Sequence, residues 1–226
     1  SHIRAGAKRV LISAPSDGAD KTIVFKVNHD TLTADDVVVS NGSCTTNVLA
    51  PVAKVLNDLC GIERGYMTTV HAYTGDQPTQ DTVHKDLYRA RAAALSMIPT
   101  STGAANAIGR VLPELKGKLH GSSIRVPTPN VSVIDLAVST SREVSINEVN
   151  DAIRQTAAGA MSGVLAFTTE PLVSVDLNHR TESSIVALPQ TDVVDGRMVR
   201  VLAWYDNEWS FATRMADTAV AMAKLI

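Results

Sequence analysis

Apolar residues recur every three to four positions from residue 48 onward, directly after a polar segment at residues 40–47. They are Val48, Leu49, Val52, Val55, Leu56 and Leu59. This spacing predicts an amphipathic helix with Cys44 in its first turn. Residues 62–71 follow, and their Ile, Tyr, Thr and Val content predicts a strand that ends at His71.

The remainder of the chain alternates between strand-like and helix-like patterns. Strands are expected at residues 123–126, 131–138, 184–187 and 198–204. Helical spacing occurs at residues 102–112 and 207–225, and Ser145 and Glu148 form a capping-box signature before a third helix. Residues 72–96 read as a long polar loop, which in a compact domain is usually functional or part of an interface. The pattern predicts an α+β fold with a mixed or antiparallel sheet covered by helices.

The first 43 residues carry a different pattern. Residues 8–14 and 22–28 are expected to form two strands, and residues 2–7 to be the end of a helix. No G-x-G-x-x-G sequence, the glycine pattern that holds a dinucleotide pyrophosphate, occurs in the chain.

Composition narrows the classes of function. The chain has 226 residues, 45% of them hydrophobic, with 21 basic and 23 acidic residues and a net charge of −2. The charges are interspersed, so nothing indicates binding to nucleic acid or to an anionic membrane. Acidic or basic residues interrupt every hydrophobic region, and no signal peptide is visible, so a cytoplasmic location is expected. The histidines lack metal-type spacing, so no metal site is expected.

Cys44 and His71 are the residues best suited to covalent chemistry. The amino terminus of a helix favours a thiolate and can hold an adjacent anion. When a strand runs back along the helix that precedes it, the end of the strand lies near the start of the helix. Cys44 and His71 are therefore expected to meet at one sheet edge. A protonated imidazole would then stabilise the thiolate, and a neutral one would serve as a base.

Six stretches of this chain together resemble phosphorylating glyceraldehyde-3-phosphate dehydrogenases. They are SCTTN at 43–47, HAYTGDQ at 71–77, DLYRARAAA at 86–94, IPTSTGAA at 98–105, RVPTP at 125–129 and WYDNEW at 204–209. The resemblance extends over essentially the whole chain.

The resemblance implies a catalytic, C-terminal portion that lacks most of the NAD-binding domain. Residues 1–43 would be the last strands of that Rossmann domain, residues 44–206 the catalytic domain, and residues 207–226 a helix that packs on the missing part. The chain would then be a piece of a longer enzyme, inactive with NAD by itself. The family also implies a homotetramer, with contacts made by the loop around Tyr88, Arg89 and Arg91.

The resemblance also implies the reaction and its site. Cys44 would form a thioester from D-glyceraldehyde 3-phosphate, with His71 as base, and inorganic phosphate would release 1,3-bisphosphoglycerate. NAD or NADP would accept the hydride, with Asn207 bonded to the nicotinamide carboxamide or capping the last helix. The two phosphate subsites are implied at Thr74, Asp76 and Arg125 for the substrate, and at Ser43, Thr45, Thr102 and Gly103 for inorganic phosphate. At neutral pH Asp76 would orient an arginine or hydroxyl.

Departures from the family pattern leave other functions to weigh. Gly42 stands where alanine is usual, Gly75 where asparagine is common, and Ser210 where glycine is common, which could perturb the cofactor geometry. One alternative is a relative of erythrose-4-phosphate dehydrogenase. Others are a Cys-His thioester hydrolase and a non-catalytic protein that keeps the domain for self-association.

Overall fold

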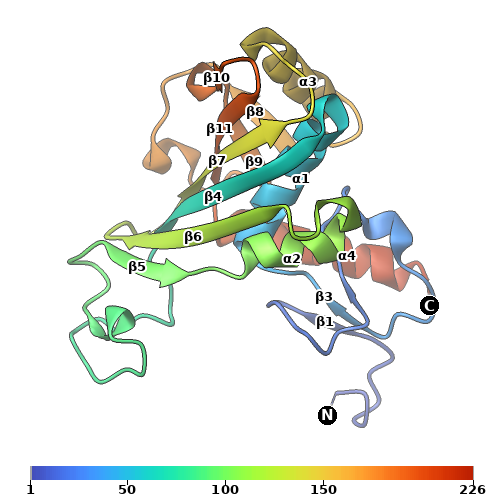
Figure 1. Cartoon of the computed structure of the whole chain (residues 1–226). Helices are drawn as coiled ribbons and strands as arrows, with labels where there is room; N and C mark the ends of the chain where they lie inside the picture. The colour runs from blue at the N-terminus through green and yellow to red at the C-terminus, as the bar shows by residue number, and fades with distance from the viewer. Residues whose placement is uncertain (1, 226) are drawn as a thin grey trace.

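The computed structural model describes residues 2–225, which form one large and one small sheet with helices packed against them (Figure 1). The large sheet has the order β5 (Ile98–Ser101), β6 (Leu119–Val126), β4 (Ile62–Ala72), β7 (Ser132–Thr140), β11 (Met198–Tyr205), β9 (Ser184–Ala187) and β8 (Leu165–Thr168). Strand β10 (Asp192–Val194) pairs with Met198–Arg200 at the start of β11. The pairs β4–β6 and β8–β9 are parallel and the others antiparallel, which confirms the predicted α+β class with a mixed sheet.

Four α-helices lie within residues 2–225. They are α1 (Cys44–Cys60), α2 (Ala104–Val111), α3 (Ile146–Ala158) and α4 (Trp209–Ala223). Short 3-10 turns occur at η1 (His29–Thr31), η2 (Tyr88–Ala90), η3 (Pro113–Leu115), η4 (Ser174–Leu177) and η5 (Leu188–Gln190). The predicted capping box is present: the Ser145 hydroxyl accepts from the Glu148 amide, and the Glu148 carboxylate accepts from the Ser145 amide at 2.8 Å.

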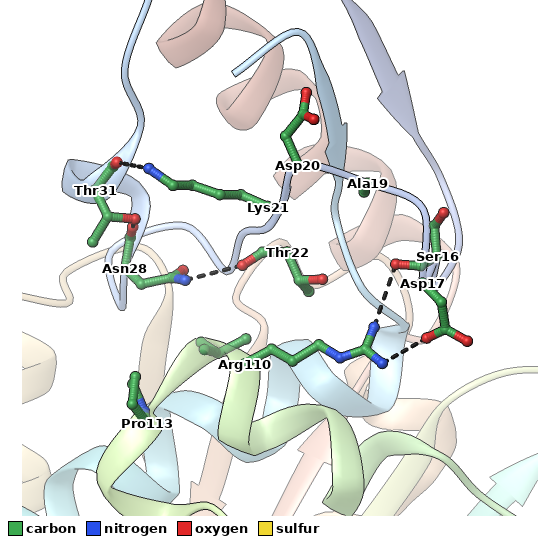
Figure 2. Close-up of a pocket in the computed structure, with 11 residues that line it drawn as sticks. Ser16, Asp17, Ala19, Asp20, Lys21, Thr22, Asn28, Thr31, Arg110 and Pro113 are labelled. Carbon is green, nitrogen blue, oxygen red and sulfur yellow. Dashed lines mark hydrogen bonds and ion pairs between the residues drawn. The ribbon is translucent and has the colours of Figure 1, made fainter. Parts of the chain in front are cut away.

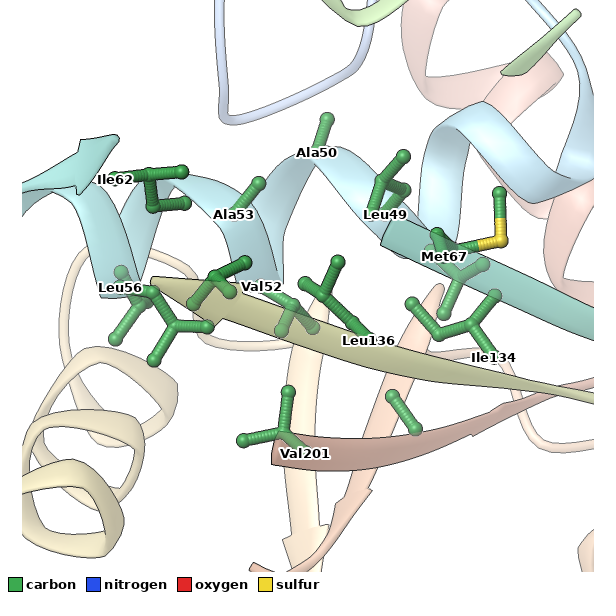
Figure 3. Packing of buried hydrophobic residues seen from close by; sticks show 14 of the residues in the cluster. Leu49, Ala50, Val52, Ala53, Leu56, Ile62, Met67, Ile134, Leu136 and Val201 are labelled. Carbon is green, nitrogen blue, oxygen red and sulfur yellow. The ribbon is translucent and has the colours of Figure 1, made fainter. Parts of the chain in front are cut away.

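The main core lies between α1 and the large sheet. Leu49, Val52 and Leu56 of α1 face Ile134 and Leu136 of β7, and all are almost completely buried (Figure 3). Burial of a Leu or Ile side chain contributes about 1.5–3 kcal/mol. This packing fixes the first turn of α1 at the edge of the sheet where β4 ends.

The small sheet differs from its prediction. It contains β1 (Val10–Ile12), β3 (Val38–Ser40) and β2 (Lys21–Thr22), all parallel. Residues 22–28 were expected to be one strand, but only Thr22 of that range is in β2. The Asn28 side chain donates to the Thr22 carbonyl and accepts from the Val24 amide. These two hydrogen bonds hold the segment in turns. Residues 2–6 form turns rather than a helix end.

Helix α4 packs against the N-terminal segment. Met222 joins Ile23, Leu32 and Val39 in a small buried cluster. Val220 on the same helix remains 56% exposed, so the apolar surface of α4 is only partly covered.

A pocket of about 380 Å³ lies between the N-terminal segment and α2 (Figure 2). Its charged groups pair with one another or with nearby groups: Arg110 with Asp17 at 2.5 Å, and Lys21 with Asp36 at 3.0 Å. The Arg110–Asp17 pair joins α2 to the N-terminal segment, whereas the Lys21–Asp36 pair lies within that segment.

Candidate active site

The structure brings Cys44 and His71 together. Cys44 is the first residue of α1, and His71 is the penultimate residue of β4. The Cys44 Sγ lies 3.4 Å from the His71 Nε2. Helix α1 begins here because the Ser43 hydroxyl accepts a hydrogen bond from the Thr46 amide at 3.0 Å and caps the helix.

The orientation of the His71 ring follows from its neighbours. Arg125 Nη1 lies 3.0 Å from both the Ala72 carbonyl oxygen and the Thr74 hydroxyl, which accounts for its two protons. The His71 Nδ1 is therefore free to donate to the Ala72 carbonyl at 2.7 Å. In this assigned tautomer the unprotonated Nε2 faces the sulfur and can accept its proton.

The electrostatics of the pair differ from one expectation. Burial, reinforced by the charge of Arg125, lowers the pKa of His71 to about 4. Burial raises the pKa of the Cys44 thiol, although hydrogen bonds from Thr45 and the charge of Arg125 oppose the rise. At neutral pH the resting pair is thus a thiol beside a neutral imidazole, and the imidazolium expected to stabilise a resting thiolate is absent. The neutral imidazole is the form that acts as a base.

A pocket of about 200 Å³ opens beside this pair. Its lining residues are Pro15, Ser43, Cys44, Thr45, Thr69, His71, Ser101, Thr102, Gly103, Ala104, Ser123 and Arg125. Sequence reasoning missed Thr69 and Ser123, whose spacing on buried strands carries no signal beyond packing. The pocket lies at the amino termini of both α1 and α2, where backbone N–H groups favour an anion.

All four residues assigned to inorganic phosphate line this pocket, but the hydroxyls of Ser43, Thr45 and Thr102 are already engaged. The Ser43 hydroxyl caps α1, and that of Thr45 lies 2.9 Å from Tyr205 Oη. The Thr102 hydroxyl accepts from the Ala104 amide at 3.2 Å, and Gly103 is the residue directly before α2. These residues therefore shape the two helix termini as well as line the pocket.

Thr74 and Asp76 lie outside the pocket lining and connect to it through Arg125. Thr74 accepts from Arg125 and donates to Asp76, whose other oxygen pairs with Arg89 at 2.6 Å. Burial acts to raise the pKa of Asp76, but the bond from Thr74 and the charges of Arg125 and Arg89 outweigh it and hold the pKa below its usual value. Asp76 thus orients a hydroxyl and an arginine, as expected. The Nε of Arg125 is buried without a partner within the described chain.

Tyr205 was also missed by sequence reasoning, although it lies in the WYDNEW stretch. It is completely buried, and its hydroxyl lies 2.9 Å from those of both Thr45 and Thr69. Its ring meets that of His71 edge-on, with centroids 5.9 Å apart. Tyr205 therefore connects the first turn of α1 to β4 beside His71.

Asn207 is buried beside Ser132, the first residue of β7. Its Oδ1 accepts from the Ser132 hydroxyl at 2.8 Å, whereas its Nδ2 is buried and has no partner among the described residues. The expectation that Asn207 caps the last helix is wrong, because the Asp206 carboxylate accepts from the amides of Glu208 and Trp209 instead. The Ser210 hydroxyl, in the first turn of α4, donates to the carbonyl of Asp206, which precedes the helix.

Two features are absent from residues 2–225. No helix in this range is long and apolar enough to cross a membrane. The same residues contain no group of three or more His, Cys, Asp or Glu side chains that could hold a metal ion. Both cysteines are free thiols.

The fold and site define an α+β domain in which a thiol and an imidazole meet at a sheet edge, beside a pocket lined by an arginine and the amino termini of two helices. Residues 43–207 match the family described as "Glyceraldehyde 3-phosphate dehydrogenase, C-terminal domain". The chain belongs to this family, as the resemblance in its sequence predicted.

Curated relatives support the assignment over the full chain. It is 68% identical over 226 residues to a glyceraldehyde-3-phosphate dehydrogenase of Cereibacter sphaeroides, covering all of this chain and 68% of the relative. It is 67% identical over 225 residues to one of Xanthobacter flavus, covering 100% of this chain and 67% of the relative. It is 54% identical over 224 residues to glyceraldehyde-3-phosphate dehydrogenase 1 of Bacillus subtilis, covering 99% and 67%. The chain thus spans about two thirds of the length of these relatives.

Proposed function

We propose that this chain carries the reacting centre for the oxidation and phosphorylation of D-glyceraldehyde 3-phosphate to 1,3-bisphosphoglycerate. The observation that carries the proposal is the Cys44 Sγ to His71 Nε2 distance of 3.4 Å at the mouth of a pocket that contains Arg125. Membership of the glyceraldehyde-3-phosphate dehydrogenase family supports this chemistry and does not favour erythrose-4-phosphate dehydrogenase or a hydrolase.

His71 moves the proton in each step. Its Nε2 accepts the thiol proton as Cys44 Sγ adds to the aldehyde carbon, and returns it to the resulting alkoxide to give a hemithioacetal. When hydride leaves the carbon, Nε2 takes the hydroxyl proton, and the product is a thioester on Cys44. Attack by inorganic phosphate then forms the acyl phosphate and releases the Cys44 thiolate, which the amino terminus of α1 stabilises until Nε2 returns its proton to the sulfur.

The phosphate groups are assigned by the chemistry of the donors. We assign the substrate phosphate to Arg125 and Thr74, with Asp76 holding Thr74 in place. We assign inorganic phosphate to the helix-terminal pocket formed by Ser43, Thr45, Thr102 and Gly103. The unpartnered Nε of Arg125 supports an anion beside this guanidinium.

Asn207 fits a nicotinamide cofactor, NAD or NADP. A nicotinamide dinucleotide supplies the hydride acceptor when bound. The buried Nδ2 of Asn207 is an unused donor suited to a carboxamide oxygen, and its Oδ1 is already held by Ser132. We also propose that residues 1–43 and 207–226 contribute to a dinucleotide-binding domain, since Met222 of α4 packs against Ile23 and Val39.

The assembly is proposed to be a homo-oligomer in the cytoplasm, on the basis of the family. Apolar side chains of the loop between β4 and β5 support self-association because they are strongly exposed. They are Val83, Leu87, Tyr88, Leu95 and Met97. Arg89 and Arg91 anchor this loop through Asp76 and Asp81 rather than facing the pocket.

Acylation by acetyl phosphate tests the proposed function without a cofactor, because this is the reverse of the phosphorolysis step. Intact-mass measurement should show one acetyl group on the unmodified chain and on the control Cys60→Ser. Cys44→Ser should give no thioester, and His71→Asn should be acylated more than about tenfold more slowly. Added phosphate should remove the acetyl group and regenerate acetyl phosphate. Loss by hydrolysis at a rate independent of phosphate would instead indicate a thioester hydrolase.

A further inference from the structure

Ser132 connects two parts of the site that the proposed reaction treats separately. It is the first residue of β7 and is 1% exposed. Its hydroxyl accepts from the Ala72 amide at 3.0 Å and bonds Asn207 Oδ1 at 2.8 Å. A single buried hydroxyl therefore links the end of β4, next to His71, to the amide of Asn207.

The direction of these bonds fixes the orientation of the Asn207 amide. A backbone N–H can only donate, so the Ala72 amide uses one lone pair of the Ser132 hydroxyl. The single hydroxyl proton is then available to Asn207, which must present its oxygen to receive it. The Asn207 nitrogen consequently points away from Ser132, and it has no other partner within the described chain.

Ser132 also supports the carbonyl that orients His71. Ala72 donates its amide to Ser132 and offers its carbonyl to the His71 Nδ1 at 2.7 Å. The residue before Ser132 is Val131, which is buried with a φ of 65°. A β-branched residue rarely adopts this conformation, and such strain persists where the surrounding structure demands it. Here the strained backbone at Val131 places the Ser132 hydroxyl between Ala72 and Asn207.

We propose that Ser132 is a positioning residue that presents the Asn207 amide as a hydrogen-bond donor to a carbonyl group of the ligand, and couples it to the His71 anchor. The ligand is a heteroaromatic carboxamide, and this identification rests on the proposed function. A free asparagine amide could rotate and offer either its oxygen or its nitrogen. With Ser132 in place, only the donor is available to the ligand.

The test compares Ser132→Ala and Ser132→Thr with the matched control Ser184→Ala. Ser184 is another buried strand serine, whose hydroxyl donates to the Val48 carbonyl at 2.8 Å. The first readout is the ¹⁵N–¹H signal pair of the Asn207 side chain in the free chain, identified by its loss in Asn207→Asp. The second is the pH profile of Cys44 alkylation, which reports on the His71 anchor.

Ser132→Ala should shift the Asn207 signals and move the midpoint of the alkylation profile by about half a pH unit, the effect of one lost hydrogen bond. Ser132→Thr, which keeps the hydroxyl, should restore both, and Ser184→Ala should change neither. Unchanged Asn207 signals in a folded Ser132→Ala chain would overturn the proposal. So would an equal effect of Ser184→Ala on both readouts.

Titration with nicotinamide mononucleotide separates this proposal from the function on which it rests. Ser132→Ala should weaken its binding about tenfold relative to the unmodified chain. If the unmodified chain does not bind this probe, the cofactor assignment fails, while the cofactor-free signals still decide the role of Ser132. Should Ser132→Ala not fold, Asn207→Asp keeps the bonded oxygen and replaces the donor nitrogen with an acceptor oxygen of a carboxylate. It should fold and lose probe binding, and a chain that binds the probe normally would contradict the proposal.

Discussion

The guanidinium of Arg125 lies 3.0 Å from the Nδ1 of His71, so a permanent positive charge faces the imidazole on the side away from Cys44. Together with burial, this contact keeps His71 neutral and lowers its pKa to about 4. The same cation opposes the rise in the Cys44 thiol pKa. Arg125 therefore favours the neutral, proton-accepting form of His71 and the thiolate form of Cys44.

The buried His71 should make stability depend on pH between about 4 and 6.5. In this window the unfolded chain binds a proton at His71 and the folded chain does not, so stability is lost as the pH falls from 6.5 towards 4. The full loss corresponds to about 3 kcal/mol. Urea unfolding of the unmodified chain and of His71→Asn should show a flatter profile for the variant. Parallel profiles would mean that His71 titrates normally in the folded chain.

Removal of the Arg125 guanidinium should weaken anion binding. Arg125→Ala should bind phosphate at least about tenfold more weakly than the unmodified chain, because charge-assisted hydrogen bonds to an anion are lost. Isothermal calorimetry with phosphate measures this. Arg91→Ala is the control, since Arg91 pairs with Asp81 on the exposed loop. Equal affinity of the Arg125→Ala chain would exclude Arg125 from the phosphate subsites.

Substitution of Gly42 should destabilise the fold, because the backbone at this position has a positive φ. Its φ is 67°, and a Cβ there would meet Thr46 only at an ordinary contact distance of 3.4 Å, so strain and not crowding decides the effect. Gly42→Ala should destabilise the chain by about 1 kcal/mol in chemical unfolding. Gly18→Ala, at a position with open space and no positive φ, should be neutral or slightly stabilising. A neutral Gly42→Ala would show that the turn before α1 readily adapts.

The exposed loop between β4 and β5 should mediate self-association. Leu87 and Leu95 are 82% and 80% exposed, which is costly for large apolar side chains unless another surface covers them. The unmodified chain should form an oligomer by light scattering at micromolar concentration. The double variant Leu87→Ser and Leu95→Ser should shift it towards monomer, whereas Val175→Ser, at another exposed apolar residue, should not. A monomeric unmodified chain would contradict the assembly proposal.

The sequence predicted most regular elements because their periodicity and caps are local signals. Helix α1, strand β4 and the Ser145 capping box occur where expected. Residues 22–28 were misjudged because apolar content suggested a strand, whereas the Asn28 side chain imposes turns. The pattern of apolar residues does not reveal that a polar side chain will bond backbone groups that a strand would otherwise use.

The sequence predicted which residues form the site, but not the hydrogen bonds between them or the protonation state of His71. The meeting of Cys44 and His71 followed from helix-strand register. The neutral state of His71 did not, because it depends on burial and on Arg125, which lies on a different strand. The roles of Tyr205 and Ser132 likewise depend on contacts between strands that are distant in sequence.

Alkylation of Cys44 as a function of pH is the most direct test of the central claim that His71 is the base for this thiol. Iodoacetamide should label Cys44 much faster than the buried Cys60 at pH 7, as peptide mass analysis of the two sites would show. In His71→Asn the labelling of Cys44 should slow by at least about tenfold, with its profile displaced to higher pH. An identical profile in the two chains, or equal labelling of Cys44 and Cys60, would contradict the account.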